Sequence, residues 1–282
     1  MNTLKSTDIM LGAIIGDIVG SRFEWNNIKT KDFEFFSYAC KTTDDSIMSL
    51  AIAQAFLTCR RNYSTLRKEA IQSMQQMGRS YPGYGYGGLF EQWICSSNPE
   101  PYNSFGNGAA MRVSACGFIA STLEESKLLA RMVTDITHNH PEGIKGGEAT
   151  AVCVFLARTG KNIDEIRDYV HKNYYPMNFT LDSIRERYEY SVTCQNTVPQ
   201  AIMAFLESTD FEDAIRNAIS IGGDSDTLAA ITGAIAEAYY GIPLEMRRQA
   251  VLFLDEQLLK ILIEFENEYP PKAYGACAQP NI

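Results

Sequence analysis

Apolar side chains recur at helical spacing along most of this chain. Ile14 and Ile18 share one face of a predicted helix, and similar stripes recur over 47–55 and 128–136. Alternating polar and apolar runs, which are typical of strands, are nearly absent. The pattern therefore predicts an all-α protein. Because no repeat or low-complexity linker divides the chain, one compact multi-helix domain, 1–282, is expected.

Three residue pairs have the spacing of a capping box, in which a cap residue and a side chain three positions later bond reciprocally. We expect helices to begin at each of these pairs. They are Ser121 with Glu124, Asn162 with Glu165, and Thr197 with Gln200.

Charge and cysteine usage limit the classes of partner and compartment. A formal net charge of -9 and a pI near 5.0 disfavour attraction to nucleic acid or to an anionic membrane surface. No segment has the length and apolarity of a membrane span, and the apolar run 9–16 is bounded by acidic residues and poorly suited to export. Without a Cys-x-x-Cys or any paired spacing, the cysteines indicate buried, reduced thiols in a cytoplasmic protein. They are Cys40, Cys59, Cys95, Cys116, Cys153, Cys194 and Cys277.

Two clusters of carboxylates and hydroxyls, far apart in the chain, each precede an apolar helix. The first is Thr43-Asp44-Asp45-Ser46, and the second is Gly222-Gly223-Asp224-Ser225-Asp226-Thr227. Four Asp side chains in one pocket would repel one another, and bound divalent cations relieve that repulsion. An all-oxygen ligand set suits Mg²⁺ or Mn²⁺ rather than zinc or copper. Helix capping explains either cluster alone, but its repetition at two helix starts favours a metal site.

The spacing of the second cluster also predicts the direction of its two carboxylates. Asp224 and Asp226 are expected in extended backbone before a helix that starts near Thr227, so that both carboxylates point the same way. The preceding Gly222 and Gly223 would let the backbone approach a ligand closely.

The first apolar helix contains small residues and one carboxylate. Glycines at every fourth position from Gly12 to Gly20 predict close packing against another helix. Asp17 lies within this helix and needs a partner, such as Arg22 or a backbone donor. Glu24 lies past the helix, where it can reach a site or form an exposed salt bridge.

The stretch 79–108 is rich in Gly, Tyr, Pro, Ser and Asn and is predicted to be a functional loop without a helix. At its end, Ser104–Arg112 places a Gly-rich turn before a helix, an arrangement that binds phosphate through backbone N–H groups. The same turn is also a common plain one, and without a P-loop lysine it does not indicate nucleoside triphosphate hydrolysis. His138 and His140 lack further zinc ligands nearby, so we expect ligand contact or helix capping from them.

These motifs together resemble one known family. Segments 16–24, 43–46, 104–112, 137–138 and 223–227 occur in the same order as in the ADP-ribosylglycohydrolases, which include dinitrogenase reductase-activating glycohydrolase and the ADP-ribosylarginine and ADP-ribosylserine hydrolases. The resemblance runs from about residue 12 to 241. It implies an all-α fold with two Mg²⁺ or Mn²⁺ ions in a central cleft.

The resemblance also implies a role for each site residue. The metal ligands would be Thr43, Asp44, Asp45, Asp224, Asp226 and Thr227. Glu24 would be a mobile glutamate near the metals, and it or Asp45 would be the base. The residues contacting the substrate would be Ser104, Phe105, Gly106, Asn107, Gly108 and Ala109 at the diphosphate, His138 at the ribose, and Gly223. The acidic residue that some arginine-specific members carry in the mid-chain loop has no counterpart in 82–88.

The expected activity is removal of ADP-ribose from a modified protein side chain by cleavage of the glycosidic bond at the distal ribose. Arginine is the favoured acceptor, followed by serine and an O-acyl ADP-ribose. Two alternatives stay open, which are a noncatalytic member that binds ADP-ribose or has a structural role, and an immunity protein against an ADP-ribosyltransferase toxin. Four crowded carboxylates argue against a structural role.

Overall fold

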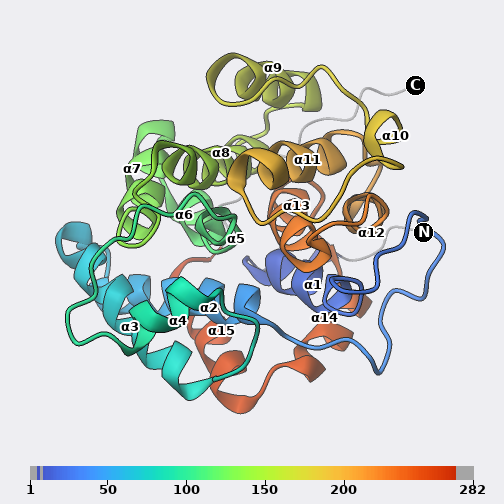
Figure 1. The fold of residues 1–282 in the computed structure, drawn as a ribbon. Coiled ribbons are helices and arrows are strands. Elements are labelled where there is room, and N and C mark those ends of the chain that lie inside the picture. The colour runs from blue at the N-terminus through green and yellow to red at the C-terminus, as the bar shows by residue number, and fades with distance from the viewer. Residues whose placement is uncertain (1–4, 7–8, 271–282) are drawn as a thin grey trace.

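The computed structural model describes residues 5–6 and 9–270, and their regular structure is nearly all helical (Figure 1). The all-α prediction is confirmed, since the strands of the described residues are limited to one antiparallel pair, β1 (Lys5–Ser6) and β2 (Ile242–Pro243). The helices are α1 (Leu11–Gly20), α2 (Asp44–Cys59), η1 (Tyr63–Thr65), α3 (Leu66–Ser80), α4 (Gly88–Cys95), α5 (Gly108–Met111), α6 (Ser114–Ile119), α7 (Leu123–Thr134), α8 (Pro141–Arg158), α9 (Ile163–Asn173), α10 (Leu181–Ile184), α11 (Cys194–Leu206), α12 (Phe211–Ile219), α13 (Ser225–Tyr240), α14 (Leu244–Ala250), η2 (Val251–Phe253) and α15 (Glu256–Glu268).

Helices α1 and α13, almost at opposite ends of the chain, form the central pair. Every residue of α1 is buried, as is α13 from its first residue to Glu237. A Cβ added at Gly16 would lie 2.0 Å from the carbonyl oxygen of Ala229, and one at Gly20 would lie 2.5 Å from that of Ser225. Only glycine permits so close a backbone approach. The predicted packing role of the glycines is confirmed, and it brings α1, which carries Asp17, against α13, which begins at the second acidic cluster.

The remaining helices surround this pair in two groups. Helices α8, α11 and α12 pack against α13, while α2 contacts α1 and packs against α3 and α15. In Figure 1, α2, α3, α4 and α15 lie in the lower part of the view, with α5 to α8 and α11 above them. The buried apolar side chains of both groups belong to one continuous core, so the two helix starts that carry the acidic clusters are held in one rigid frame.

The capping signals had mixed outcomes. Asn162 and Glu165 form a reciprocal capping box at the start of α9, as predicted. Helix α7 begins one residue later than predicted, with Thr122 as its N-cap. The third prediction is wrong because Thr197 lies inside α11, whose N-cap is Thr193. Tertiary packing of the buried helix α11 outweighed the local capping signal at Thr197.

Two further expectations need correction. The stretch 79–108 is not free of helix, because α4 occupies its centre and buries Phe90 and Trp93. The six described cysteines are unbridged, but Cys95 is exposed rather than buried; Cys277 lies outside the described residues.

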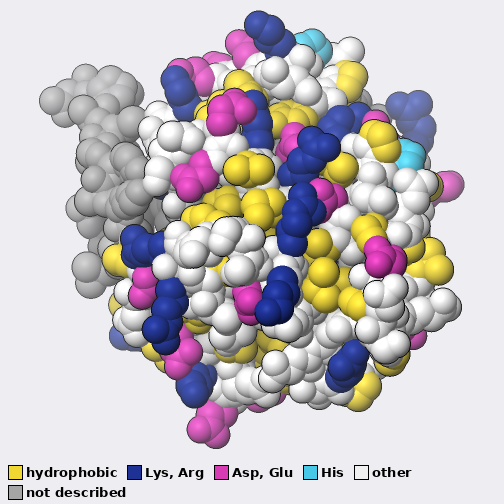
Figure 2. Space-filling model, turned by 90° about the vertical axis from the view of Figure 1, so that its left-hand side faces the viewer, with side chains coloured by type: hydrophobic (Ala, Val, Ile, Leu, Met, Phe, Trp, Pro, Cys, Tyr) yellow, Lys and Arg dark blue, Asp and Glu magenta, His cyan; other side chains and the backbone are white. Residues whose placement is uncertain are grey.

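One face of the molecule mixes both signs of charge. Figure 2 shows a face on which Lys and Arg side chains lie among Asp and Glu side chains, without a continuous basic patch. Over the described residues, each helix falls short of the length or apolarity that crossing a bilayer needs.

Candidate active site

Asp17 holds the start of α2 in place. Its carboxylate accepts hydrogen bonds from the Thr43 backbone N (2.9 Å), the Thr43 hydroxyl (2.6 Å), the Ser46 backbone N (3.1 Å) and the Ser46 hydroxyl. Burial raises the pKa of Asp17, and the bonds from Ser46 and Thr43 oppose that rise. The partner is therefore a set of backbone and hydroxyl donors, not Arg22. Three of the four donors bond Oδ2 and one bonds Oδ1, so Asp17 orients the start of the acidic cluster.

Helix α2 begins at the first acidic cluster. Thr43 is its N-cap and accepts from the backbone N of Asp45 at 3.3 Å. Asp45 is 2% exposed, and its Oδ2 accepts from the Thr227 hydroxyl at 3.2 Å, while its buried Oδ1 has no hydrogen-bond partner among the described residues. Burial and then the neighbouring Asp44 raise the pKa of Asp45 well above its usual value. A buried carboxylate oxygen without a hydrogen-bond partner is chemically suited to bind a cation.

The second acidic cluster starts α13. The helix begins at Ser225, not near Thr227, so the expectation of extended backbone through Asp226 is wrong. Asp224 occupies the N-cap position without capping, and its Oδ2 accepts instead from the Asn107 side chain at 2.6 Å. Asp226 lies in the first turn and accepts from the backbone N of Thr227 at 3.0 Å. Both carboxylates nevertheless line one pocket.

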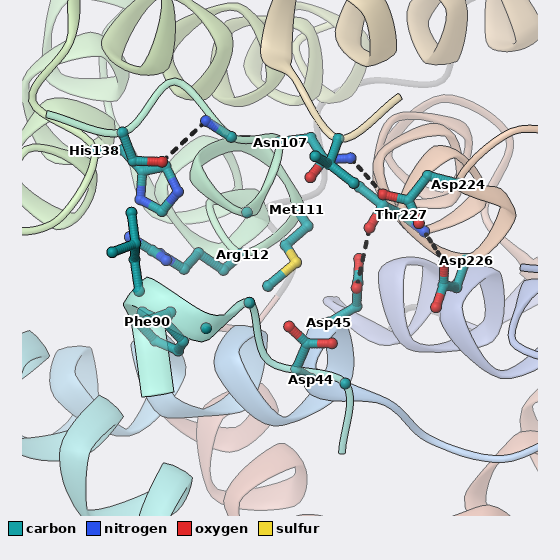
Figure 3. A pocket seen from close by; sticks show the side chains of 18 of the residues that line it. Asp44, Asp45, Phe90, Asn107, Met111, Arg112, His138, Asp224, Asp226 and Thr227 are labelled. Atoms are coloured by element: carbon teal, nitrogen blue, oxygen red, sulfur yellow. Dashed lines mark hydrogen bonds between the residues drawn. The ribbon is translucent and has the colours of Figure 1, made fainter. Parts of the chain in front are cut away.

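The two clusters meet there (Figure 3). Carboxylate oxygens of Asp17, Asp45 and Asp226 lie within 4.8 Å of one another, and so do those of Glu24, Asp224 and Asp226. Asp226 belongs to both groups, so it links the Asp45 side of the pocket to the Asp224 side. Burial, then Asp224 and Asp45, raise the pKa of Asp226 well above its usual value. Each carboxylate thus resists ionisation in the absence of positive charge.

Glu24 reaches the acidic end of the pocket from the segment after α1. Its carboxylate is half-buried and accepts from the Tyr190 hydroxyl at 3.5 Å. Burial and then Asp224 raise its pKa. The segment is tied to the second cluster, because the Asn27 side chain donates to the Gly223 carbonyl and accepts from the Gly223 backbone N, both at 2.8 Å. Gly223 is thus a backbone anchor behind the pocket rather than part of its wall.

The Gly-rich turn forms another part of the wall. Ser104, Gly106, Asn107 and Gly108 line the pocket. The turn is fixed by hydrogen bonds to the segment before α11, where the Asn107 backbone N donates to the Val192 carbonyl at 2.8 Å. The other predicted members lie off the wall. Phe105 is 41% exposed and packs on the His140 ring, and Ala109 is buried beneath the turn.

His138 is held as a neutral hydrogen-bond donor. Arg112, only 1% exposed, donates to the Thr137 hydroxyl at 2.6 Å, and that oxygen lies 2.7 Å from His138 Nδ1. The Thr137 hydroxyl has two possible acceptors, His138 Nδ1 at 2.7 Å and the Thr134 carbonyl at 3.3 Å. The shorter contact favours donation to Nδ1, which leaves the hydrogen of His138 on Nε2. Burial and then Arg112 lower the pKa of His138 well below its usual value. A Cβ at Gly106 would be 3.4 Å from Nε2, so this donor faces the Gly-rich turn.

The whole pocket has a volume of about 430 Å³, within the usual range of small-molecule sites. Its two ends differ in charge. Figure 3 shows Asp44, Asp45, Asp224 and Asp226 at one end and His138, Arg112 and Phe90 at the other. The only metal-site residue predicted from the sequence that does not line the pocket is Thr43, whose hydroxyl bonds Asp17.

Several wall residues escaped the sequence analysis. Arg112 ends the segment 104–112, for which only its turn had a predicted role. No sequence pattern pointed to Trp25, Tyr102, Phe90 or Tyr190, which also line the pocket. Only the placement of a carboxylate inside an apolar helix pointed to Asp17. His140 is the N-cap of α8, so the capping alternative applies to it, whereas His138 lines the pocket as expected for a ligand contact.

Comparisons with known proteins agree on one family. A sequence profile described as ADP-ribosylglycohydrolase matches residues 4–270. Human ADP-ribosylhydrolase ARH3 is 27% identical, with 83% of this chain and 84% of the relative aligned. ADP-ribosylarginine hydrolase Tri1 of Pseudomonas putida (strain GB-1) is 24% identical over 84% of this chain and 71% of the relative. A solved structure titled ADP-ribosylglycohydrolase-related protein complex shares the fold, with a TM-score of 0.69, 22% identity, and coverage of 93% of this chain and 97% of that one.

Proposed function

The chain belongs to the ADP-ribosylglycohydrolase family, and from this premise we propose that it is a metal-dependent hydrolase that removes ADP-ribose from modified protein side chains. The relatives named as ADP-ribosylhydrolases support the hydrolase class. The observation that carries the proposal is the meeting of two acidic helix starts in one pocket, where Asp45 keeps a buried oxygen without a partner. We take 1–282 as a single domain of this type.

The proposed cofactor is a pair of divalent cations, Mg²⁺ or Mn²⁺. Asp44, Asp45, Asp224 and Asp226 would hold them, with the hydroxyls of Thr43 and Thr227. The donors fit, since all are oxygens and Asp226 has carboxylate oxygens within 4.8 Å of those of both Asp45 and Asp224. When bound, such a pair orients ribose hydroxyls and polarises water.

Glu24 is the proposed general base. It lies beside Asp224 and Asp226 at the acidic end, where its carboxylate can accept a proton from water. It would take a proton from water as the water oxygen bonds to the anomeric carbon, through a transition state of oxocarbenium character. Asp45 is the alternative base.

The opposite end of the pocket would bind the diphosphate and the ribose. His138 offers a neutral N–H donor, and Ser104, Gly106, Asn107 and Gly108 lie beside it. The buried guanidinium of Arg112 adds positive charge at this end, where an anionic group is favoured. The bipolar pocket thereby supports one orientation of ADP-ribose, with its distal ribose toward the carboxylates.

Arginine is the proposed acceptor, followed by serine and an O-acyl ADP-ribose. The relative named as an ADP-ribosylarginine hydrolase supports arginine. A purely structural role is disfavoured because the crowded carboxylates raise one another's pKa and so destabilise the metal-free fold.

The test is incubation of the protein with substrates ADP-ribosylated separately on Arg, Ser, Asp or Glu, and Cys, with Mg²⁺ or with EDTA. Metal-dependent release of ADP-ribose from the arginine-linked substrate is the expected result. Release that survives EDTA refutes the metal requirement, and no release from any linkage refutes the hydrolase itself.

A further inference from the structure

Two aromatic rings stand at the mouth of the pocket. Trp25 and Tyr190 both line it, and their rings stack with centroids 5.2 Å apart and planes 26° apart. Trp25 is nevertheless 74% exposed and Tyr190 43% exposed. Leu89 and Val192 continue this exposed apolar rim around the same opening. Large apolar side chains gathered at the mouth of a pocket indicate a surface that a ligand covers.

The stacked pair adjoins the acidic end of the pocket rather than the end with Arg112. The Tyr190 hydroxyl donates to Glu24 Oε1, and Glu24 lies within 4.8 Å of Asp224 and Asp226. In the proposed orientation, ADP-ribose fills the pocket from His138 to these carboxylates. The group attached to the anomeric carbon would then lie next to Glu24 and contact the rings of Trp25 and Tyr190.

We propose that Trp25 and Tyr190 form the leaving-group subsite and that this subsite takes a planar cation, the guanidinium of an ADP-ribosylated arginine. A guanidinium stacks on aromatic faces and is attracted to their negative charge. The adjacent Glu24 carboxylate adds an acceptor of opposite charge. A serine linkage offers neither a plane nor a charge, so the rings discriminate between the two acceptors. This inference rests on the proposed function.

The reaction balances without another reagent. The water oxygen forms a bond to the anomeric carbon, the carbon–nitrogen bond breaks, and its electron pair stays on the guanidino nitrogen. The proton taken from water by Glu24 passes to that nitrogen. The products are ADP-ribose and a guanidinium, which carries the same charge as in the substrate and can remain stacked until it dissociates.

The experiment compares two peptides of one sequence, mono-ADP-ribosylated on Arg or on Ser. Trp25→Ala should lower kcat/KM on the arginine-linked peptide about 3- to 30-fold, which is the range of a cation–π contact. Trp25→Phe should restore most of this loss because it keeps a ring. Trp25 also hydrogen-bonds Glu24, so the serine-linked peptide should lose a smaller part of its kcat/KM than the arginine-linked one. The affinity for free ADP-ribose should change less than about twofold.

Tyr38→Ala is the matched control, because Tyr38 is a fully exposed aromatic residue that does not line the pocket. It should leave both substrates unaffected. Equal losses on both peptides and on ADP-ribose would place Trp25 in ADP-ribose binding and overturn the inference. An unchanged kcat/KM on the arginine-linked peptide overturns the subsite alone. A wild-type protein that hydrolyses neither peptide refutes the proposed function and the subsite with it.

Discussion

Asp17→Asn and Asp45→Asn should change the stability of the metal-free protein in opposite directions, although both remove a buried carboxylate from the same cluster. Asp17 accepts four hydrogen bonds from Thr43 and Ser46. Three of these donors bond Oδ2 and one, the Thr43 hydroxyl, bonds Oδ1. An amide whose oxygen replaces Oδ2 turns its NH₂ group toward that hydroxyl, so at least one of the four donors loses its acceptor. Each unsatisfied buried donor costs about 1–3 kcal/mol. The expected loss is therefore about 1–3 kcal/mol, which lowers Tm by roughly 2–5 °C for a chain of this size.

Burial raises the pKa of both carboxyls, but four hydrogen bonds oppose that rise at Asp17 and only one, from Thr227, opposes it at Asp45. Its Oδ1 accepts nothing, and burial with the charge of Asp44 raises its pKa. A raised folded-state pKa means that the stability contribution is complete below the unfolded pKa, near 4, and is lost as pH rises through the folded pKa. Asp45→Asn removes that loss. The metal-free variant should match or exceed the wild type in Tm, and its advantage should grow as pH rises from about 4.

Differential scanning calorimetry in EDTA and in Mg²⁺ over a pH series measures both effects. Wild type should gain stability with Mg²⁺ by mass action, and Asp45→Asn should lose most of that gain. Asp17→Asn should remain less stable than wild type in either condition. If Asp45→Asn melts as low as Asp17→Asn in EDTA, the assignment of Asp17 as an anchor and Asp45 as a metal ligand is wrong.

Three further outcomes are expected. Glu24→Gln should lower kcat about 10²- to 10⁴-fold while calorimetry shows ADP-ribose affinity within a few-fold of wild type, and a normal rate would remove Glu24 as the base. Gly106→Val should weaken ADP-ribose binding at least about tenfold, seen in the same titration, because a Cβ there already lies 3.3 Å from Ser104 Oγ and 3.4 Å from His138 Nε2. Thr137→Val removes the donor to His138 Nδ1, so ¹⁵N spectra should show the imidazole leaving the single Nε2–H tautomer and KM should rise; an unchanged tautomer would refute the relay.

Local signals were sufficient for much of the fold. Helical periodicity predicted the all-α class, and Asn162 with Glu165 marked the start of α9 because a capping box is satisfied within four residues. The same logic failed at Thr197, which lies inside α11. There the apolar contacts of a buried helix outweigh a cap of about 1 kcal/mol.

The sequence by itself determined which residues can act at the site, since the oxygen ligands, the Gly-rich turn and His138 are all readable as side-chain chemistry. Only the tertiary structure decided their partners. The glycines of α1 admit α13 at backbone contact distance, and this packing puts Asp226 beside Asp45. It also places Asp17, a carboxylate like the others, where its oxygens accept hydrogen bonds from Thr43 and Ser46. Trp25 and Tyr190, which stack, are 165 positions apart in the chain. A local sequence pattern does not predict which distant residues helix packing will bring into contact.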